Sequence, residues 1–311
     1  MVGAACTALL SGACLLHGTG PTALFRRPAS GAGATSAAGA GATAARTAVL
    51  VGAGDIGSCV SSWDSRTADL LTDIDGTIFT AGDNSQDEGT HDDFAECFGP
   101  TWGRFKSRIR PVPGNHDYLT ENAEGYFDYF GRAAGPEGRG YYSYDAGDWH
   151  VVALNSNCSQ VSCAKGSAQE RWLRADLGAT EKTCTAAFWH HSLFTSSDGH
   201  HAATETLPLF QALYDHGAEI VVSGHNHVYE RFAPQNPRGE RDDAHGIRQF
   251  TVGTGGGGGH YGFGEILPNS QVHDDRTFGV LKLTLKPGSY DWRFVPVEAG
   301  MFTDSGTGSC H

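Results

Sequence analysis

Short apolar runs that each end in a turn rich in Gly, Asp, Asn or His dominate the chain from residue 46 to about residue 297. The runs are four or five residues long and rich in β-branched and aromatic side chains, which is typical of buried strands. They lie at residues 48–51, 77–80, 150–154, 185–189, 219–222 and 249–252. Such strands can bury both faces only in a covered sheet, and the turns of parallel strands then gather along one edge.

Helix-like segments alternate with these strands. Apolar residues recur at three- and four-residue spacing within residues 66–71, 92–98, 168–177 and 204–216. Later, residues 279–285 and 289–295 alternate with period two around Lys286-Pro-Gly, which predicts an antiparallel hairpin. The pattern predicts an α/β (α+β) fold of layered sheets flanked by helices, in one domain over residues 47–311.

The amino-terminal part of the sequence has a different composition. Residues 1–25 contain no Lys, Arg, Asp or Glu, and residues 2–16 resemble the apolar region of an export signal, so we expect a leader at 1–27. An apolar leader without an export role is the alternative. Residues 28–45 are all Pro, Ala, Ser, Gly or Thr, and we expect a flexible linker over 28–46.

Eight cysteines bear on the compartment. Two, Cys6 and Cys14, lie in the expected leader, and Cys158 and Cys163 form the only close pair among the other six, so the spacing does not fit a four-ligand zinc site. We expect disulfides, with Cys158–Cys163 closing a short loop and, by elimination, Cys59–Cys97 and Cys184–Cys310. This favours a secreted or otherwise extracytoplasmic protein over a cytosolic one with six buried thiols.

The charge balance excludes one class of partner. The 311 residues include 22 Lys and Arg against 35 Asp and Glu, for a net charge of −13. Proteins that coat nucleic acids need clustered positive charge, so we expect no nucleic-acid binding. Downstream of the leader no apolar run reaches the roughly 18 residues of a membrane span, and we expect none.

Side chains able to bind metals follow four of these strand-like segments and also the short segment Pro111-Val-Pro113. A turn needs no imidazole, so five such clusters are hard to attribute to turn formation alone. Mixed carboxylate, amide and imidazole donors suit a pair of metal ions. The motifs are Gly-Asp55-Ile-Gly, Gly-Asp83-Asn, Gly-Asn115-His116-Asp117, His190-His191 and Gly-His225-Asn-His227.

The order of these motifs resembles the metallophosphoesterase (calcineurin-like) superfamily, and within it the purple acid phosphatases, whose first motif is also GDxG. The resemblance runs from about residue 49 to 231 and includes Tyr229-Glu230-Arg231 after the last motif. It implies a four-layer αββα sandwich and a dinuclear-metal phosphoesterase with a metal-bound hydroxide nucleophile. The implied activity is that of a phosphomonoesterase of the acid phosphatase type, acting on a small phosphoester, with a phosphodiesterase as the alternative.

The resemblance also implies a ligand set. One metal ion would be held by Asp55, Asp83 and His227, and the other by Asp83, Asn115, His190 and His225, with Asp83 bridging. Purple acid phosphatases have a tyrosinate ligand where this chain has Gln86. A neutral amide favours divalent ions at both positions, so we expect two divalent ions of Fe, Zn or Mn and a colourless protein.

Four further residues have roles implied by the resemblance. His116 would donate a proton to the phosphoryl group or the leaving oxygen, and Asp117 would orient and charge His116. His200 and His201 would bind oxygens of the substrate, with an exposed polar loop as the alternative interpretation.

Two rival functions follow from other features. Gly52-Ala-Gly54-Asp-Ile-Gly57 after a strand matches GxGxxG, and Asp73 and Asp75 lie about 20 residues further on, as in a nucleotide-dependent oxidoreductase. This reading leaves the Asn115-His116 and His225-Asn-His227 motifs unexplained. A binding or scaffold protein with a decayed site is the other rival, against which the intact donors argue.

Overall fold

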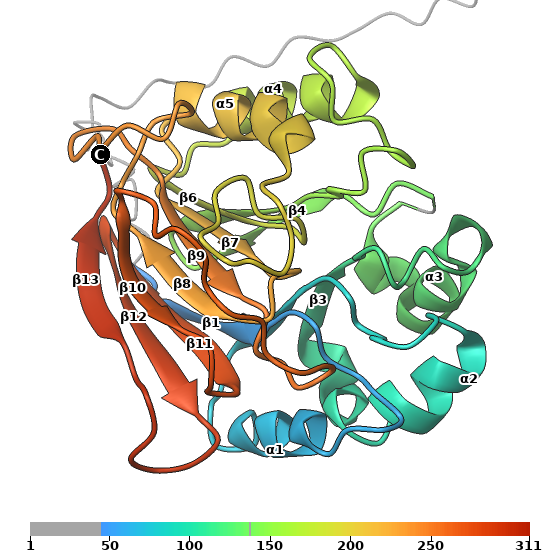
Figure 1. Ribbon diagram of the computed structural model, residues 1–311. Helices are drawn as coiled ribbons and strands as arrows, with labels where there is room; N and C mark the ends of the chain where they lie inside the picture. Colours follow the sequence, from blue (N-terminus) through green and yellow to red (C-terminus); the bar gives the residue numbers. More distant parts are fainter. Residues whose placement is uncertain (1–44, 137) are drawn as a thin grey trace, which may run out of the picture. The chain divides into compact units, whose positions relative to one another are not determined.

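The computed structural model describes residues 45–136 and 138–311. The expected leader, most of the expected linker, Cys6 and Cys14 lie outside the described residues. The described unit is built from two β-sheets with helices on their outer faces (Figure 1).

The two sheets contain six and seven strands. In spatial order, the six-stranded sheet consists of β13 (Ser305–Ser309), β12 (Ser289–Pro296), β11 (Gly279–Lys286), β1 (Ala48–Ala53), β2 (Thr77–Ala81) and β3 (Ile109–Val112). The seven-stranded sheet consists of β10 (Ser270–Asp274), β8 (Tyr229–Phe232), β9 (Arg248–Val252), β7 (Ile220–Ser223), β6 (Cys184–Phe188), β5 (Trp149–Ala153) and β4 (Tyr142–Ala146). Strands β1 to β3 are parallel, as are β5, β6, β7 and β9.

The helices cover the two outer faces (Figure 1). The α-helices are α1 (Trp63–Leu70), α2 (His91–Asp93) and α3 (Glu124–Phe130) beside the six-stranded sheet, and α4 (Ala168–Ala179) and α5 (Leu207–Asp215) over the seven-stranded sheet. The other helical segments are the π-helix η1 (Phe94–Phe98) and the 3₁₀ segments η2 (Trp102–Arg108), η3 (Glu121–Ala123), η4 (Gly131–Ala134) and η5 (Thr204–Thr206). Within the described ranges, the helices are all too short or too polar to cross a membrane.

Strand β6 shows why the apolar runs are continuous. Ala186 and Phe188 belong to the core between the sheets, where the rings of Phe188 and Phe79 of β2 lie 5.7 Å apart. Ala187 and Trp189 instead belong to the core beneath α4 and α5. Both faces of the strand are therefore buried, as expected for a central parallel strand, and the expected four-layer αββα sandwich is confirmed.

The local predictions agree with this fold in most places. The six expected strands and the terminal hairpin β11–β12 form within one or two residues of the expected ends. The helix expected over 92–98 is instead one turn of α-helix followed by η1, where the amide of Gly99 donates to the carbonyl of Phe94. The three expected disulfides are confirmed: Cys59–Cys97, Cys158–Cys163 and Cys184–Cys310.

Candidate metal centre

The metal-capable residues lie at the carboxyl ends of parallel strands from both sheets. Asp55 follows β1, Asp83 follows β2 and His225 follows β7, and each adopts a positive φ, of 59°, 45° and 68° respectively. Such a conformation costs roughly 1–3 kcal/mol in a residue other than glycine and is concentrated at functional sites. Of the five non-glycine residues with positive φ in the described ranges, these three lie together.

Asp55 and His227 form one side of the cluster. Oδ1 of Asp55 lies 3.3 Å from Nε2 of His227, and Oδ2 accepts a hydrogen bond of 2.9 Å from the amide of His225. Nδ1 of His227 lies 2.9 Å from the carbonyl of Gly259, which leaves Nε2 facing the carboxylate. This second contact fixes the ring in the manner of a metal-ligating histidine.

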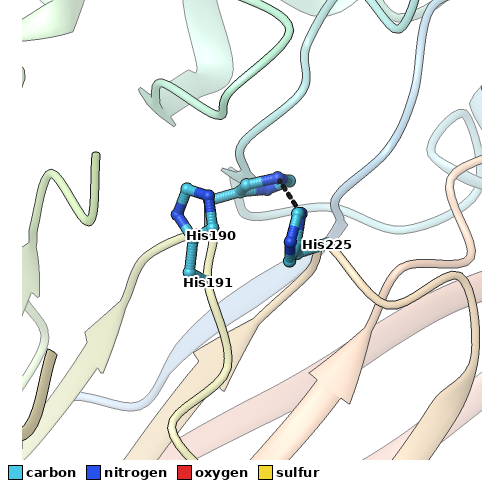
Figure 2. A group of neighbouring side chains, drawn as sticks. All are labelled: His190, His191 and His225. Atoms are coloured by element: carbon cyan, nitrogen blue, oxygen red, sulfur yellow. Dashed lines mark hydrogen bonds between the residues drawn. The ribbon is translucent and has the colours of Figure 1, made fainter. Parts of the chain in front are cut away.

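The other side of the cluster converges on His190. Its Nε2 lies 3.2 Å from Oδ2 of Asp83, 3.0 Å from Oδ1 of Asn115 and 3.2 Å from Nδ1 of His225. Figure 2 shows His190, the adjacent His191 and His225, with the contact between His190 and His225 dashed. Donor atoms of Asp55, Asp83 and His190 all lie within 4.8 Å of one another, so the two sides form one site.

Burial and charge oppose each other within the cluster. Burial alone lowers the pKa of His190, but the carboxylate of Asp83 outweighs it and raises that pKa to about 9. Burial would raise the pKa of Asp83, and the charge of His190 lowers it. Burial and the neighbouring imidazoles lower the pKa of His225. The positive charge of protonated His190 therefore offsets the negative charge of the buried Asp83 carboxylate. A bound cation would take over that role.

The surroundings of these donors fit metal ions. Oδ1 of Asp55 is buried with no hydrogen-bond partner, which is costly unless a cation or water satisfies it. Glycines leave room for the donors: a Cβ at Gly114 would lie 2.1 Å from Oδ1 of Asp83, and one at Gly82 would lie 2.5 Å from the ring of His190. Two carboxylates, one amide and three imidazoles are a suitable donor set for two divalent ions.

The chain matches the model of the calcineurin-like phosphoesterase family over residues 50–229, more than half of its length. This chain belongs to that family. The match begins within β1 and ends at the start of β8, so it contains all six of the donors expected to bind metal.

Relatives of this family member include plant purple acid phosphatases. Purple acid phosphatase 15 of Arabidopsis thaliana is 28% identical over 57% of this chain and 40% of its own length. Purple acid phosphatase 21 of the same plant is 28% identical over 66% of this chain and 49% of its own length. The resemblance to the purple acid phosphatase branch is confirmed, and this chain spans less than half the length of these relatives.

A solved structure supports the fold. The purple acid phosphatase PPD1 from yellow lupin (Lupinus luteus) seeds superposes with a TM-score of 0.70, at 18% identity, over 85% of this chain and 54% of that one. The layered arrangement of this phosphoesterase family member is thus shared with a purple acid phosphatase.

The loop after β3 brings His116 to the cluster but gives Asp117 a different role from the expected one. Nδ1 of His116 lies 2.9 Å from the carbonyl of Asp87, so the expectation that Asp117 orients His116 is wrong. The carboxylate of Asp117 is fully buried and accepts hydrogen bonds of 2.8–3.2 Å from N–H groups of Gly114, Asn84 and Ser85. Burial, and then the charge of Asp83, raise the pKa of Asp117 to about 6. Asp117 joins the loops after β2 and β3.

Of the two histidines expected to bind substrate, one packs on the cluster. The ring of His200 stacks on that of His225 with centroids 3.9 Å apart, and its amide donates to Oδ1 of Asn226. His201 is exposed. The ring of Tyr261 stacks on that of His227, with centroids 4.5 Å apart.

The loop that matches GxGxxG is already hydrogen-bonded. The amides of Asp55, Ile56 and Gly57 donate to the carbonyls of Gly82, Asp83 and Asn84, and α1 begins only at Trp63. A dinucleotide fingerprint requires free amides at the start of a helix, so this loop cannot bind a pyrophosphate in that way.

Sequence reasoning missed two residues that support the site. Oγ of Ser156 accepts hydrogen bonds from the amides of His190 and His191 and contacts Nδ1 of His191 at 2.9 Å. Ser156 closely follows β5, so the search for polar side chains directly after strands, which identified the other residues, could also have identified Ser156. The second is Asp87, whose main-chain contact with His116 carries no sequence signal.

Gln86 lies where the resemblance predicts a departure in metal chemistry. Its Oε1 is buried with no hydrogen-bond partner, and its Cβ lies 2.6 Å from where a Cβ on Gly257 would sit. The neighbouring Gly258 lies against the ring of His227. Gln86 therefore belongs to the lining on the Asp55 and His227 side.

Proposed function

We propose that this chain is a metal-dependent phosphoric ester hydrolase that acts on small phosphate monoesters. One observation carries the proposal: donor atoms from five strand ends, contributed by both sheets, converge at one point. The buried Oδ1 of Asp55 at that point forms no hydrogen bond and lies 3.3 Å from Nε2 of His227, which supports a cation there.

The proposed ligand set is the one that the resemblance to purple acid phosphatases implies, and the contacts between the donors support its division into two groups. Asp55, Asp83 and His227 would hold one divalent ion. The second ion would be held by Asp83, Asn115, His190 and His225, whose atoms meet around Nε2 of His190. When bound, two such ions of Fe, Zn or Mn polarise phosphoryl oxygens and make water a nucleophile near neutrality.

Residues beside these ligands would handle the substrate. His116, whose side chain is 33% exposed, can meet the leaving oxygen and give it a proton. His200 stacks on His225 and would contact phosphoryl oxygens, with the exposed His201 as the second contact. Asp117 would act only by holding the two loops that carry Asp83 and Asn115.

A monoester rather than a diester is the preferred substrate on grounds of charge. A monoester carries up to two negative charges near neutrality, whereas a diester carries one. Two divalent ions bring four positive charges against the two carboxylates of Asp55 and Asp83, and this positive site stabilises the more highly charged ester better. A diesterase of the same family is the second candidate.

The three disulfides also support a location outside the cytoplasm. Cys59–Cys97, Cys158–Cys163 and Cys184–Cys310 persist only in an oxidising environment. A thiol assay on unreduced, denatured protein exported from its host would then find none of these six cysteines free; six free thiols would contradict the proposed location.

The function is tested by metal removal and reloading. Protein stripped with a chelator, and then reloaded separately with manganese, zinc or iron, is assayed with p-nitrophenyl phosphate and bis(p-nitrophenyl) phosphate. We expect hydrolysis only after reloading, with a higher kcat/KM for the monoester. Equal hydrolysis by stripped protein would refute the metal-dependent mechanism, and a higher kcat/KM for the diester would replace the proposal by its alternative.

A matched pair of variants serves as the control. His190→Gln removes an imidazole from the proposed centre, and His150→Gln removes one from a separate histidine–carboxylate cluster at Asp145 and Asp176. Only His190→Gln should lose metal and hydrolysis. Loss of metal in both variants would mean that the effect is on folding.

A further inference from the structure

The ring of His116 is oriented by a main-chain group. A carbonyl can only accept hydrogen bonds, so the contact of 2.9 Å between the Asp87 carbonyl and Nδ1 of His116 requires the proton to be on Nδ1. Nε2 is then the nitrogen left for chemistry. It lies 4.0 Å from Oδ2 of Asp83, the carboxylate proposed to bridge the metals. The position of the Asp87 carbonyl therefore decides which nitrogen faces the centre.

The side chain of Asp87 in turn fixes this carbonyl. Its Oδ2 accepts a hydrogen bond of 2.7 Å from the amide of Cys59, in the loop after β1. Cys59 is joined to Cys97 of η1 by a disulfide. The preceding residue is held as well, because the amide of Gln86 donates to the carbonyl of Gly57 at 2.6 Å.

The chain on the other side of Asp87 is also fixed. The carboxylate of Asp93 accepts hydrogen bonds from the amides of Glu88 and Thr90, at 3.2 and 3.0 Å. Gly89 has a φ of +68°, and a Cβ there would lie 2.7 Å from the carbonyl of His116. The loop thus approaches the main chain of His116 as closely as a glycine allows.

We propose that Asp87 is a positioning residue for His116, acting through its own carboxylate and carbonyl. The proposal rests on the role proposed above for His116. As the ester P–O bond breaks, the leaving oxygen keeps the electron pair of that bond and takes the proton from Nε2 of the His116 imidazolium. The N–H electron pair remains on Nε2 of the ring, which is then the neutral imidazole with its proton on Nδ1. The hydrogen bond from the Cys59 amide to Asp87 keeps Nε2 in position for that transfer.

Two substitutions at Asp87 test this role. Asp87→Ala removes the acceptor for the Cys59 amide, and we expect kcat for p-nitrophenyl phosphate to fall by about 10- to 100-fold, the scale of lost supporting contacts. KM and metal content should change by less than about twofold. Asp87→Asn keeps an oxygen acceptor and should retain most of kcat. A loss in Asp87→Asn equal to that in Asp87→Ala would overturn the proposal.

A double-mutant cycle separates positioning from general damage to the loop. In a His116→Ala background, Asp87→Ala should lower kcat no further, because the residue on which it acts is gone. An equal further loss in that background would show that Asp87 acts on something else and would overturn the inference.

A readout without catalysis separates this inference from the proposed function. Nitrogen-15 NMR of the zinc-loaded protein, with the His116→Ala spectrum to assign the signals, reports which ring nitrogen carries the proton. We expect Nδ1–H in the natural chain and in Asp87→Asn, and a changed signal in Asp87→Ala. An unchanged signal in Asp87→Ala would overturn the inference, whereas a natural chain that hydrolyses no phosphoester would overturn only the proposed function.

Discussion

Two histidine–carboxylate clusters lie at opposite ends of the parallel strands, and they differ in how their polar atoms are arranged. At the amino end of β5, His150 is held between two carboxylates, with Nδ1 3.2 Å from Asp145 and Nε2 2.7 Å from Asp176. At the carboxyl end of β6, three donor atoms from different residues meet one nitrogen of His190. The contacts of His150 are opposed, and those of His190 converge.

This difference shows which features distinguish a structural ion pair from the proposed metal site. Both nitrogens of His150 are used, its side chain is 7% exposed, and no lone pair remains for a cation. In the proposed centre an oxygen of Asp55 has no hydrogen-bond partner, and three of the residues have positive φ. Unsatisfied atoms and strained backbone persist only where something else offsets their cost.

The largest expected effect comes from Asp83→Ala. The substitution removes the carboxylate proposed to bridge both ions, so we expect hydrolysis to fall to the level of the metal-free protein. Metal analysis alongside a p-nitrophenyl phosphate assay checks this. Full activity in this variant would show that the cluster around His190 is no more a metal site than the cluster around His150.

The next effect in size comes from His116→Ala. His116 is proposed to give a proton without binding metal, so we expect turnover to fall by about 10²- to 10⁴-fold, the usual range for acid–base groups. Metal content, measured by atomic emission, should stay that of the natural chain. Loss of metal would show that His116 is a ligand and that the convergent cluster is larger than described.

A smaller effect, on stability alone, is expected for His150→Gln. Burial lowers the pKa of His150, but Asp176 and Asp145 outweigh it and raise that pKa above the ordinary value of 6.5. The imidazolium therefore stabilises the fold fully below pH 6.5, and this contribution is lost as the pH rises through the raised pKa.

The variant should lower the free energy of unfolding by about 1–2 kcal/mol at pH 5, and by less at alkaline pH. Denaturant titrations of both proteins at pH 5 and pH 9 measure this difference. If the difference in free energy of unfolding grows with pH, His150 does not stabilise the fold as an imidazolium. If His150→Gln loses bound metal, His150 belongs to the metal centre and not to a separate structural cluster.

The smallest change is expected from Gln86→Tyr, which should alter colour more than activity. The natural chain has a neutral amide there and should be colourless when loaded with iron. The variant brings a phenol to the lining beside Asp55 and His227, and visible spectroscopy under oxidising conditions should show a charge-transfer band. A strong band in the natural chain would mean that another tyrosine, such as Tyr261, reaches the metal.

Much of this could be predicted because it is encoded locally. Central strands such as β6 are buried on both faces, so each is a continuous apolar run that predicts a buried strand directly from the sequence. Edge strands were missed for the opposite reason: β13 is Ser-Gly-Thr-Gly-Ser and carries no apolar side chain, and it forms by pairing with β12. Its order comes from pairing with β12 and not from its own side chains.

The candidate site divides in the same way. The sequence by itself determined which residue types follow each strand, since a strand and its turn are neighbours in the chain. These residues include all six of the donors proposed to bind metal, from Asp55 to His227. Only the tertiary structure decided that Asp87 rather than Asp117 orients His116. It also decided that the contacts of His190 converge and those of His150 do not. Distances between loops depend on how two sheets pack, and no short stretch of sequence encodes that packing.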